Sequence, residues 1–166
     1  ADYEDLKAVG IGDYSMDGHY VLTADIDASA SRNEKNAADS TAGFQPIGIA
    51  YYGTEQSYFG GVFDGADHTI SNLYSMSTDT RSTAMFMAVG PNGVVKNLKM
   101  SDCFISVKFV WAAGSVAVMN FGLIENVELK RDTVRAPVST GGVVGINESG
   151  IIQDVDFSGV VYGIND

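Results

Sequence analysis

Gly122-Leu123-Ile124-Glu125-Asn126-Val127 is one of four segments in this chain that follow a common pattern. Each places a β-branched aliphatic residue first, then a polar or charged residue, an Asn or Asp, and finally a Leu or Val. The third position of the pattern is occupied by Asn72, Asn97, Asn126 and Asp154, at intervals of 25, 29 and 28 residues. A period of this length is typical of stacked structural repeats, in which each unit buries its apolar face against its neighbours.

The segments between these motifs predict strands and turns. They are short, rich in β-branched residues and bounded by Gly and Asn, and residues 58–166 show no helical stripe of apolar residues. The leucine-rich repeat is an alternative, because Val95, Leu98 and Met100 fit its spacing. It is disfavoured, since the recurrent Asn lies between two aliphatic residues where that repeat has none. We therefore predict an all-β fold, a parallel β-helix (β-solenoid).

Equivalent residues of successive coils stack about 4.8 Å apart in such a fold. We expect aliphatic residues of the motif to form internal ladders. The column of Asn72, Asn97, Asn126 and Asp154 is expected at a bend, turned inward, with its amides bonded to each other and to the backbone. On the outside, Lys96 should lie over Glu125 and Lys99 over Glu128, in pairs worth a few tenths of a kcal/mol.

The chain divides into a cap and a stack of coils. Residues 1–19 are predicted to form an N-terminal helical cap, because Tyr3, Leu6 and Val9 recur at helical spacing. Residues 20–166 should form the coils, beginning with an alternating strand at 20–28. Residues 29–43 are polar and are predicted to be a surface loop within the first coil.

The composition excludes several partners. The 166 residues include 10 Lys and Arg against 21 Asp and Glu, which gives a formal net charge of −11. Nucleic acid and anionic lipid are therefore not expected, because both require a basic surface. No apolar run reaches the ~20 residues needed to cross a bilayer, so we expect no direct membrane insertion. Cys103 is the single cysteine and is flanked by apolar residues, which predicts a small core residue.

The motifs together resemble bacterial surface repeat proteins that carry the GLUG motif. The residues that carry the resemblance are Asp25-Ile26-Asp27, Pro46-Ile47-Gly48, Phe59 to Gly65 followed by His68 to Leu73, and Gly142-Val143-Val144-Gly145-Ile146-Asn147. The resemblance implies a right-handed parallel β-helix with a short N-terminal capping helix, secreted and located at the cell surface in large proteins such as adhesins. It brings no catalytic residues.

Two groups of residues are candidate binding sites. Asp25 and Asp27 point the same way on a predicted strand, and Asp39 follows in the polar loop. Three carboxylates of this kind would suit a hard cation, so calcium is the one cofactor that the pattern allows. Tyr51, Tyr52 and Tyr58 form an aromatic cluster, for which packing in the core or cap is the first interpretation and stacking on a sugar ring of a host or environmental glycan the second.

We do not expect an enzyme. The sequence has two His and shows no Ser/His/Asp or Cys/His pattern. Pectate-lyase-like enzymes share the β-helix fold, so a carbohydrate-binding or carbohydrate-active module is the alternative function. Its charged groups would be Glu125, Glu128, Arg131 and Asp156.

The last residues of the sequence predict an open edge. Val160, Val161, Tyr162 and Ile164 read as part of a coil and not as a polar cap. An uncovered solenoid end invites pairing, either with the rest of a longer surface protein or with other protein subunits in a self-assembling filament. The predicted function is a non-catalytic extracellular structural or adhesive β-solenoid.

Overall fold

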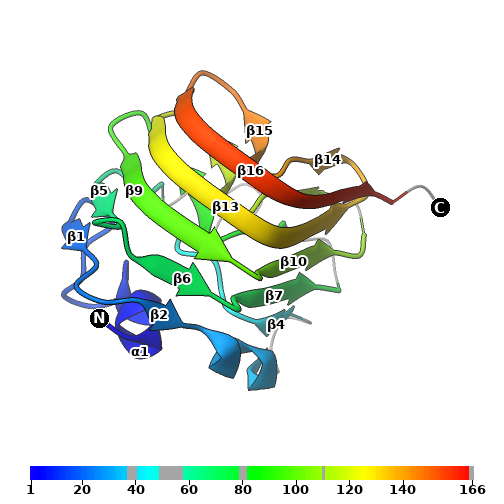
Figure 1. Cartoon of the computed structure of the whole chain (residues 1–166), viewed down its shortest axis with the longest axis horizontal. Coiled ribbons are helices and arrows are strands. Elements are labelled where there is room, and N and C mark those ends of the chain that lie inside the picture. Colours follow the sequence, from blue (N-terminus) through cyan, green and yellow to red (C-terminus); the bar gives the residue numbers. More distant parts are fainter. Residues whose placement is uncertain (37–40, 49–57, 79–81, 110, 165–166) are drawn as a thin grey trace.

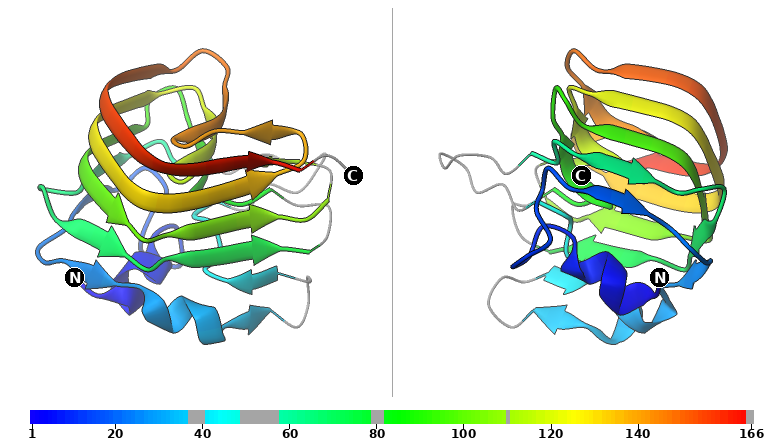
Figure 2. Two further views of the ribbon diagram at one scale, coloured as in Figure 1. Left: turned by 45° about the vertical axis from the view of Figure 1, so that its right-hand side comes forward. Right: turned by 90° about the vertical axis from the view of Figure 1, so that its left-hand side faces the viewer.

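The computed structural model describes residues 1–36, 41–48, 58–78, 82–109 and 111–164. Its strands run parallel from coil to coil and stack into a solenoid, with the short helix α1 (Tyr3–Ala8) at one end and strand β16 (Ile151–Gly163) at the other (Figures 1 and 2). This confirms the predicted fold class, an all-β parallel β-helix with a short N-terminal helix.

In the described part of the chain, three sheets form the walls of the solenoid. The largest wraps around three sides, because β9 (Val94–Ser101) bends at one corner, β13 (Leu123–Ala136) and β16 bend at two, and each continues pairing on the next side (Figure 1). The other strands of this sheet are β1 (His19–Val21), β2 (Ile26–Asp27), β3 (Lys35–Asn36), β4 (Thr41–Gly43), β5 (Val62–Asp64), β6 (Thr69–Ser71), β7 (Tyr74–Ser77) and β10 (Phe104–Val107). The two smaller sheets contain β8 (Phe86–Val89), β12 (Ala117–Asn120) and β15 (Val144–Asn147), and β11 (Ala112–Ala113) with β14 (Ser139–Thr140).

The register of the later coils follows the sequence motif. Val95, Ile124 and Ile152 stack in one column, and Leu98, Val127 and Val155 in another. Lys96 pairs in register with Glu125, and Lys99 with Glu128, as predicted. The ammonium groups of these lysines, however, lie near carboxylates of the preceding coil: Lys96 Nζ lies 3.5 Å from Asp64 and Lys99 Nζ 3.8 Å from Asp67.

The first motif lies in a different register from the other three. Ile70 stacks on Met100, not on Val95, because β6 pairs with the second half of β9. The partner of Val95 in the preceding coil is Phe63 of β5. The ladder prediction is therefore wrong for the first motif, whose residues lie one side further around the coil.

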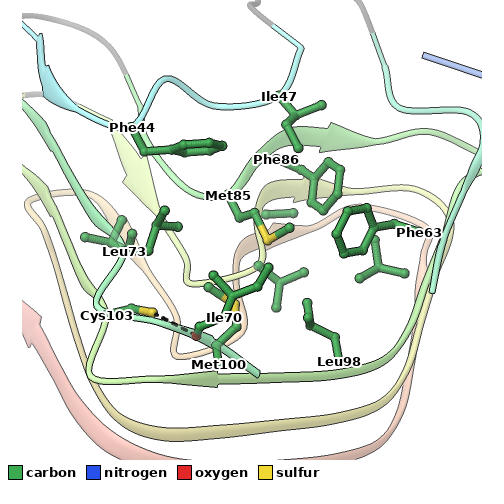
Figure 3. Packing of buried hydrophobic residues seen from close by; sticks show 14 of the residues in the cluster. Phe44, Ile47, Phe63, Ile70, Leu73, Met85, Phe86, Leu98, Met100 and Cys103 are labelled. Carbon is green, nitrogen blue, oxygen red and sulfur yellow. Dashed lines mark hydrogen bonds between the residues drawn. The ribbon is translucent and has the colours of Figure 1, made fainter. Parts of the chain in front are cut away.

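The core fills the inside of the coils with large apolar side chains (Figure 3). Phe86 is central, with ring centroids 4.9 Å from Phe59 and 5.5 Å from Phe63. Ile70, Leu73 and further residues of the core are fully buried. Full burial of one such side chain contributes about 1.5–3 kcal/mol, so the core is the main source of stability.

The N-terminal end of the stack is closed by a composite cap. Helix α1 begins with a capping box between Asp2 and Asp5 and buries Tyr3 and Leu6 in the core. It is shorter than the segment 1–19 predicted as the cap, and the strand predicted at 20–28 is divided into β1 and β2.

The segment 29–43 is not a plain loop, in contrast to the prediction. It contains the 3-10 helix η1 (Ser29–Asn33) and the antiparallel strands β3 and β4. Strand β4 pairs antiparallel with β7 and thereby covers the first edge of that side of the sheet. Gly43 suits this close approach, because a Cβ there would lie 2.1 Å from the carbonyl oxygen of Tyr74. The polar composition misled the prediction, since backbone pairing and not apolar burial holds the segment.

Candidate functional site

The bends of the long strands are built from residues in the left-handed conformation. Asn97, Asn126 and Asp154 have φ angles of 50°, 50° and 52° and stack at one corner of the solenoid. Asn and Asp adopt this conformation at lower cost than other non-glycine residues, which explains their recurrence in the motif. The predicted bend is confirmed at these three positions.

An amide ladder runs along this corner. Asn97 Nδ2 donates to Asp64 Oδ1 at 3.0 Å, and Asn126 Nδ2 donates to Asn97 Oδ1 at 2.8 Å. Partial burial works against the charged form of Asp64, but hydrogen bonds from the Ala66 amide and from Asn97 lower its pKa. Asn126 and Asp154 are exposed. The prediction that the side chains of this column turn inward is therefore wrong. The chain bends at these residues, and their side chains lie on the outer surface of the corner.

Asn72 belongs to a second corner. Its φ of 60° matches those of Asp102 and Arg131, and its backbone N–H donates to the carbonyl oxygen of Ser101. Arg131 binds the Asp102 carboxylate with two hydrogen bonds of 2.7 and 2.5 Å. Asn72 thus leaves the predicted column of Asn72, Asn97, Asn126 and Asp154.

The carboxylates proposed as calcium ligands bind protein donors. Asp25 Oδ1 accepts from the Thr69 backbone amide at 2.9 Å and lies 3.2 Å from His68 Nδ1. Both contacts lower the pKa of Asp25, and the hydrogen bond from Thr69 has the larger effect. Asp27 Oδ1 accepts from Asn72 and from the Ser29 amide, which lower its pKa in that order. Asp39 lies outside the described residues. Within the described ranges no three His, Cys, Asp or Glu are grouped as a metal would require.

The tyrosine cluster is described in part. Tyr51 and Tyr52 lie outside the described residues. Tyr58 is 37% exposed, and its ring centroid lies 5.4 Å from that of Phe121. It borders a shallow surface pocket together with Gly60, Gly90 and Pro91.

A carboxyl group lies in the core at the second corner. Asp132 is fully buried at the position that Leu73 and Cys103 occupy in the two preceding coils. Its Oδ1 accepts from the Cys103 amide at 2.9 Å, whereas Oδ2 has no hydrogen-bond partner among the described residues, although Ser115 lies beside it. Burial raises the pKa of Asp132. The uncharged acid is thus the form that the core favours.

The C-terminal end of the stack is open. Strand β16 pairs with β13 along one edge, and no described strand pairs with its other edge. Val160, Val161 and Tyr162 are 46%, 41% and 51% exposed, and Ile164 is half-buried. In Figure 2 this strand forms the last rung of the stack, opposite the capped end.

One outer side of the solenoid, which we call the aromatic face, carries rings and guanidinium groups in place of ion pairs. Its outward side chains are Tyr74 of β7, Phe104 of β10, Thr133 and Arg135 of β13, and Tyr162 of β16. Tyr74 and Phe104 are stacked at 5.4 Å with an interplanar angle of 9°, and Arg135 lies 5.8 Å from the Tyr162 ring centroid. Beyond Phe104 the small Thr133 leaves a hollow of about 620 Å³.

Two known proteins are similar to this chain. It is 35% identical over 151 residues to halomucin from Haloquadratum walsbyi, an alignment that covers 90% of this chain and 2% of halomucin. It is 29% identical over 113 residues to a putative Gly-rich membrane protein from Evansella cellulosilytica, covering 68% of this chain and 12% of that protein. The chain thus spans a small fraction of either relative.

No family model matches the chain, and no solved structure matches it. In the described part of the chain no helix is long and apolar enough to cross a membrane.

Two features of the surface and core were missed by the sequence analysis. Asp132 follows Arg131 in a run of polar residues. Its burial could be predicted only if the position of the second corner were known, because that position aligns Asp132 with Leu73 and Cys103. The sequence does contain a signal for the aromatic face, because Phe104 and Tyr162 lie at outward positions of strands in which inward and outward residues alternate. That signal required the strand register, which the motif column alone did not supply.

Proposed function

We propose that this chain is a non-catalytic extracellular β-solenoid segment of a larger cell-surface protein, with a structural or adhesive role. The observation that carries the proposal is the open apolar end at β16. The similarity to halomucin and to a protein named as a Gly-rich membrane protein supports association with a cell surface or membrane. We retain the GLUG-motif surface proteins as the proposed family.

The side chains at the open end are apolar like those of the core, but no further coil covers them in the described structure. Three core positions of β16 are only partly buried: Ile152, Val155 and Phe157. Their partners in the preceding coil are nearly or fully buried: Ile124, Val127 and Leu129. The same positions are therefore protected wherever a later coil covers them. Large exposed apolar patches of this kind mark interaction surfaces.

The two ends of the stack are different. At the N-terminal end α1 buries Tyr3 and Leu6, and β4 covers the edge of β7. A second copy therefore meets a capped surface if it stacks head to tail. This asymmetry favours a further coil of a longer protein as the partner of β16, and makes the filament the second candidate.

Three of the four charged groups of the enzymatic alternative are engaged with neighbours. Glu128 pairs with Lys130 at 2.5 Å, Gln153 donates to Glu125 at 2.9 Å, and Arg131 is held by Asp102. Such pairing along a solvated face supports a structural surface. A carbohydrate-binding role is favoured by a different observation, the aromatic face with its stacked Tyr74 and Phe104 rings.

The test is the mass of the purified chain over a concentration series, with electron microscopy of the same samples. We expect concentration-dependent association that Val161→Lys abolishes, because it places a charge on the open end in register with the buried Val134. Val21→Lys is the matched control, since Val21 is 60% exposed on β1 at the capped end.

Each outcome separates the candidates. Long filaments would replace the longer-protein proposal with a filament subunit. A monomer that binds no apolar dye, with or without Val161→Lys, would contradict a covered β16 edge. Turnover of a polysaccharide that is lost in Glu128→Gln would contradict the non-catalytic assignment.

A further inference from the structure

The aromatic face contains an open hollow at the level of Thr133, which we call the slot. Tyr74, Phe104, Thr133 and Val160 form one outward column along β7, β10, β13 and β16. Tyr74 and Phe104 stack face to face, and Arg32 covers the Tyr74 ring at 5.0 Å. The stack ends at Thr133, whose side chain is too small to cover the outer face of Phe104. Successive strands are about 4.8 Å apart, so the space beside the Phe104 ring at the level of Thr133 has the height of one stacked ring.

The walls of this slot provide more than apolar surface. The hollow is lined by Phe104, Thr133, Arg135, Tyr162, Gly163 and Ile164. Phe104 contributes a ring face, Thr133 a hydroxyl group, and Arg135 a guanidinium group that lies over the Tyr162 ring. A planar guanidinium group matches a carboxylate with two parallel hydrogen bonds. An aromatic wall with a few polar groups is the usual composition of a site for a small ring.

The charge of the face selects among ligands. The strand segments 74–77, 104–107, 133–136 and 160–163 contain no Asp or Glu, although the whole chain carries a formal charge of −11. Within these segments no carboxylate competes with an anion for Arg135. A nucleic acid, with a phosphate at every residue, would still meet the negative charge of the rest of the molecule. A glycan with spaced carboxylates avoids most of that repulsion.

We propose that this slot binds an acidic sugar residue of a glycan, with the sugar ring stacked on Phe104 and its carboxylate bound by Arg135. The slot opens on the outer side of the sheet, whereas a further coil would pair with the edge of β16. Ligand binding and coil stacking therefore use different surfaces. The site supplies a ligand class for the adhesive role proposed above and rests on that role, but its test does not depend on association of the chain.

The experiment is a titration of the full chain, followed by amide chemical shifts and calorimetry. The probe is a hexasaccharide of alternating glucuronic acid and N-acetylglucosamine, and the neutral N-acetylglucosamine hexamer is its uncharged counterpart. We expect shifts concentrated at Phe104, Thr133, Arg135 and Tyr162 with the acidic probe, and binding of the neutral probe weaker by about tenfold, because it lacks the charged hydrogen bonds.

Three variants separate the parts of the site. Arg135→Gln should weaken binding of the acidic probe by about tenfold and leave the neutral probe unaffected. Thr133→Phe should abolish binding of both probes, because the new ring would extend the Tyr74–Phe104 stack and fill the slot. Lys99→Gln removes one positive charge from a different side and is the control, with affinity unchanged; circular dichroism checks that each variant folds.

Several results would overturn the proposal. They are the absence of shifts with the acidic probe at about 10 mM, shifts at other residues, or an equal loss of affinity in Lys99→Gln and Arg135→Gln. A blocked Asp-Tyr dipeptide that binds the slot when the sugar does not would assign it to a protein partner. Any of these results would leave the proposed structural role of the open end standing.

Discussion

The backbone amide of Cys103 donates a 2.9 Å hydrogen bond to Oδ1 of Asp132, which lies directly above it in the next coil. This contact places a carboxyl group in the interior of the solenoid, where the two preceding coils have a thiol and a leucine. Strand β13 has one residue more than β16 at this point, since Arg131 and Asp132 oppose the single Gly159. Asp132 follows the left-handed Arg131 just as Cys103 follows Asp102, and this shared corner conformation turns Asp132 into the core.

The first prediction concerns the pH dependence caused by Asp132. Because burial raises its pKa in the folded state above the ordinary value of 3.8, its neutral form is stabilised by folding. The contribution to stability is complete below pH 3.8 and is lost as the pH rises through the raised pKa. Asp132→Asn keeps an oxygen for the Cys103 amide and removes the titration, so at pH 7 the variant should be more stable by about 1–3 kcal/mol.

Urea unfolding of both proteins from pH 3 to pH 8 measures this difference. The stability gap should be small at the acid end and should widen as the pH rises. The surface carboxylates with lowered pKa values, such as Asp25 and Asp102, act in the opposite direction in both proteins and cancel in the difference. A gap that does not change with pH would show that Asp132 is not buried as a neutral acid.

The second prediction concerns the amide ladder. Asn126 combines a φ of 50° with a hydrogen bond to Asn97. Asn126→Ala should lower the free energy of unfolding by about 2 kcal/mol, because it loses the hydrogen bond and strains the backbone. Asn126→Gly loses only the hydrogen bond and should cost about 1 kcal/mol. Equal costs in chemical denaturation would contradict the left-handed conformation at this corner.

The sequence predicted the later coils better than the first one for a physical reason. Asn97, Asn126 and Asp154 are spaced 29 and 28 residues apart, so one column accounts for all three. Asn72 is 25 residues before Asn97 and satisfies the same local pattern at a different corner. Both corners require a left-handed residue followed by a buried one, and a local motif cannot distinguish them. Strand pairing, which is non-local, decides the register.

The same limit explains why the candidate sites were predicted less well than the fold. Asp27 and Asn72 are 45 positions apart in sequence, and their hydrogen bond follows from the stacking of β2 on β6. Without that register the Asp27 carboxylate looks free to bind a cation. The open edge at Val160–Tyr162 was predictable, because a run of apolar residues without a polar cap is a local signal.

The third prediction concerns the cap. Leu6 of α1 is 2% exposed and contributes to the core at the N-terminal end of the stack. Leu6→Ala should destabilise the chain by about 2–5 kcal/mol, as is usual for a truncated core leucine. Lys7→Ala, on the same helix, truncates a half-buried side chain that pairs with Glu4 and Glu34 and should cost less, about 0–1 kcal/mol. Similar costs for the two variants in thermal unfolding would indicate that α1 does not cover the core.

The fourth prediction concerns the reactivity of Cys103. Burial raises the pKa of this thiol well above its ordinary value, and the nearby Asp132 adds to the effect. The folded chain should therefore resist thiol-specific reagents at pH 8, and the reaction should proceed at the rate of a free thiol only in denaturant. Rapid labelling without denaturant would contradict the packing of Cys103 against the Ile70 carbonyl shown in Figure 3.

The last prediction concerns the exchange of backbone amides in β16. In a parallel strand the amides point alternately to the two neighbours, so about every second amide of β16 faces away from β13. In dilute chain these amides should exchange at the rate of open backbone, while those bonded to β13 are protected, as is the Ile151 amide by the Gly122 carbonyl. At concentrations where the chain associates, the unprotected set should become protected, and Val161→Lys should prevent this change. Uniform protection of β16 in the dilute monomer would mean that its outer edge is already paired within the chain, which would remove the basis for an assembly surface there.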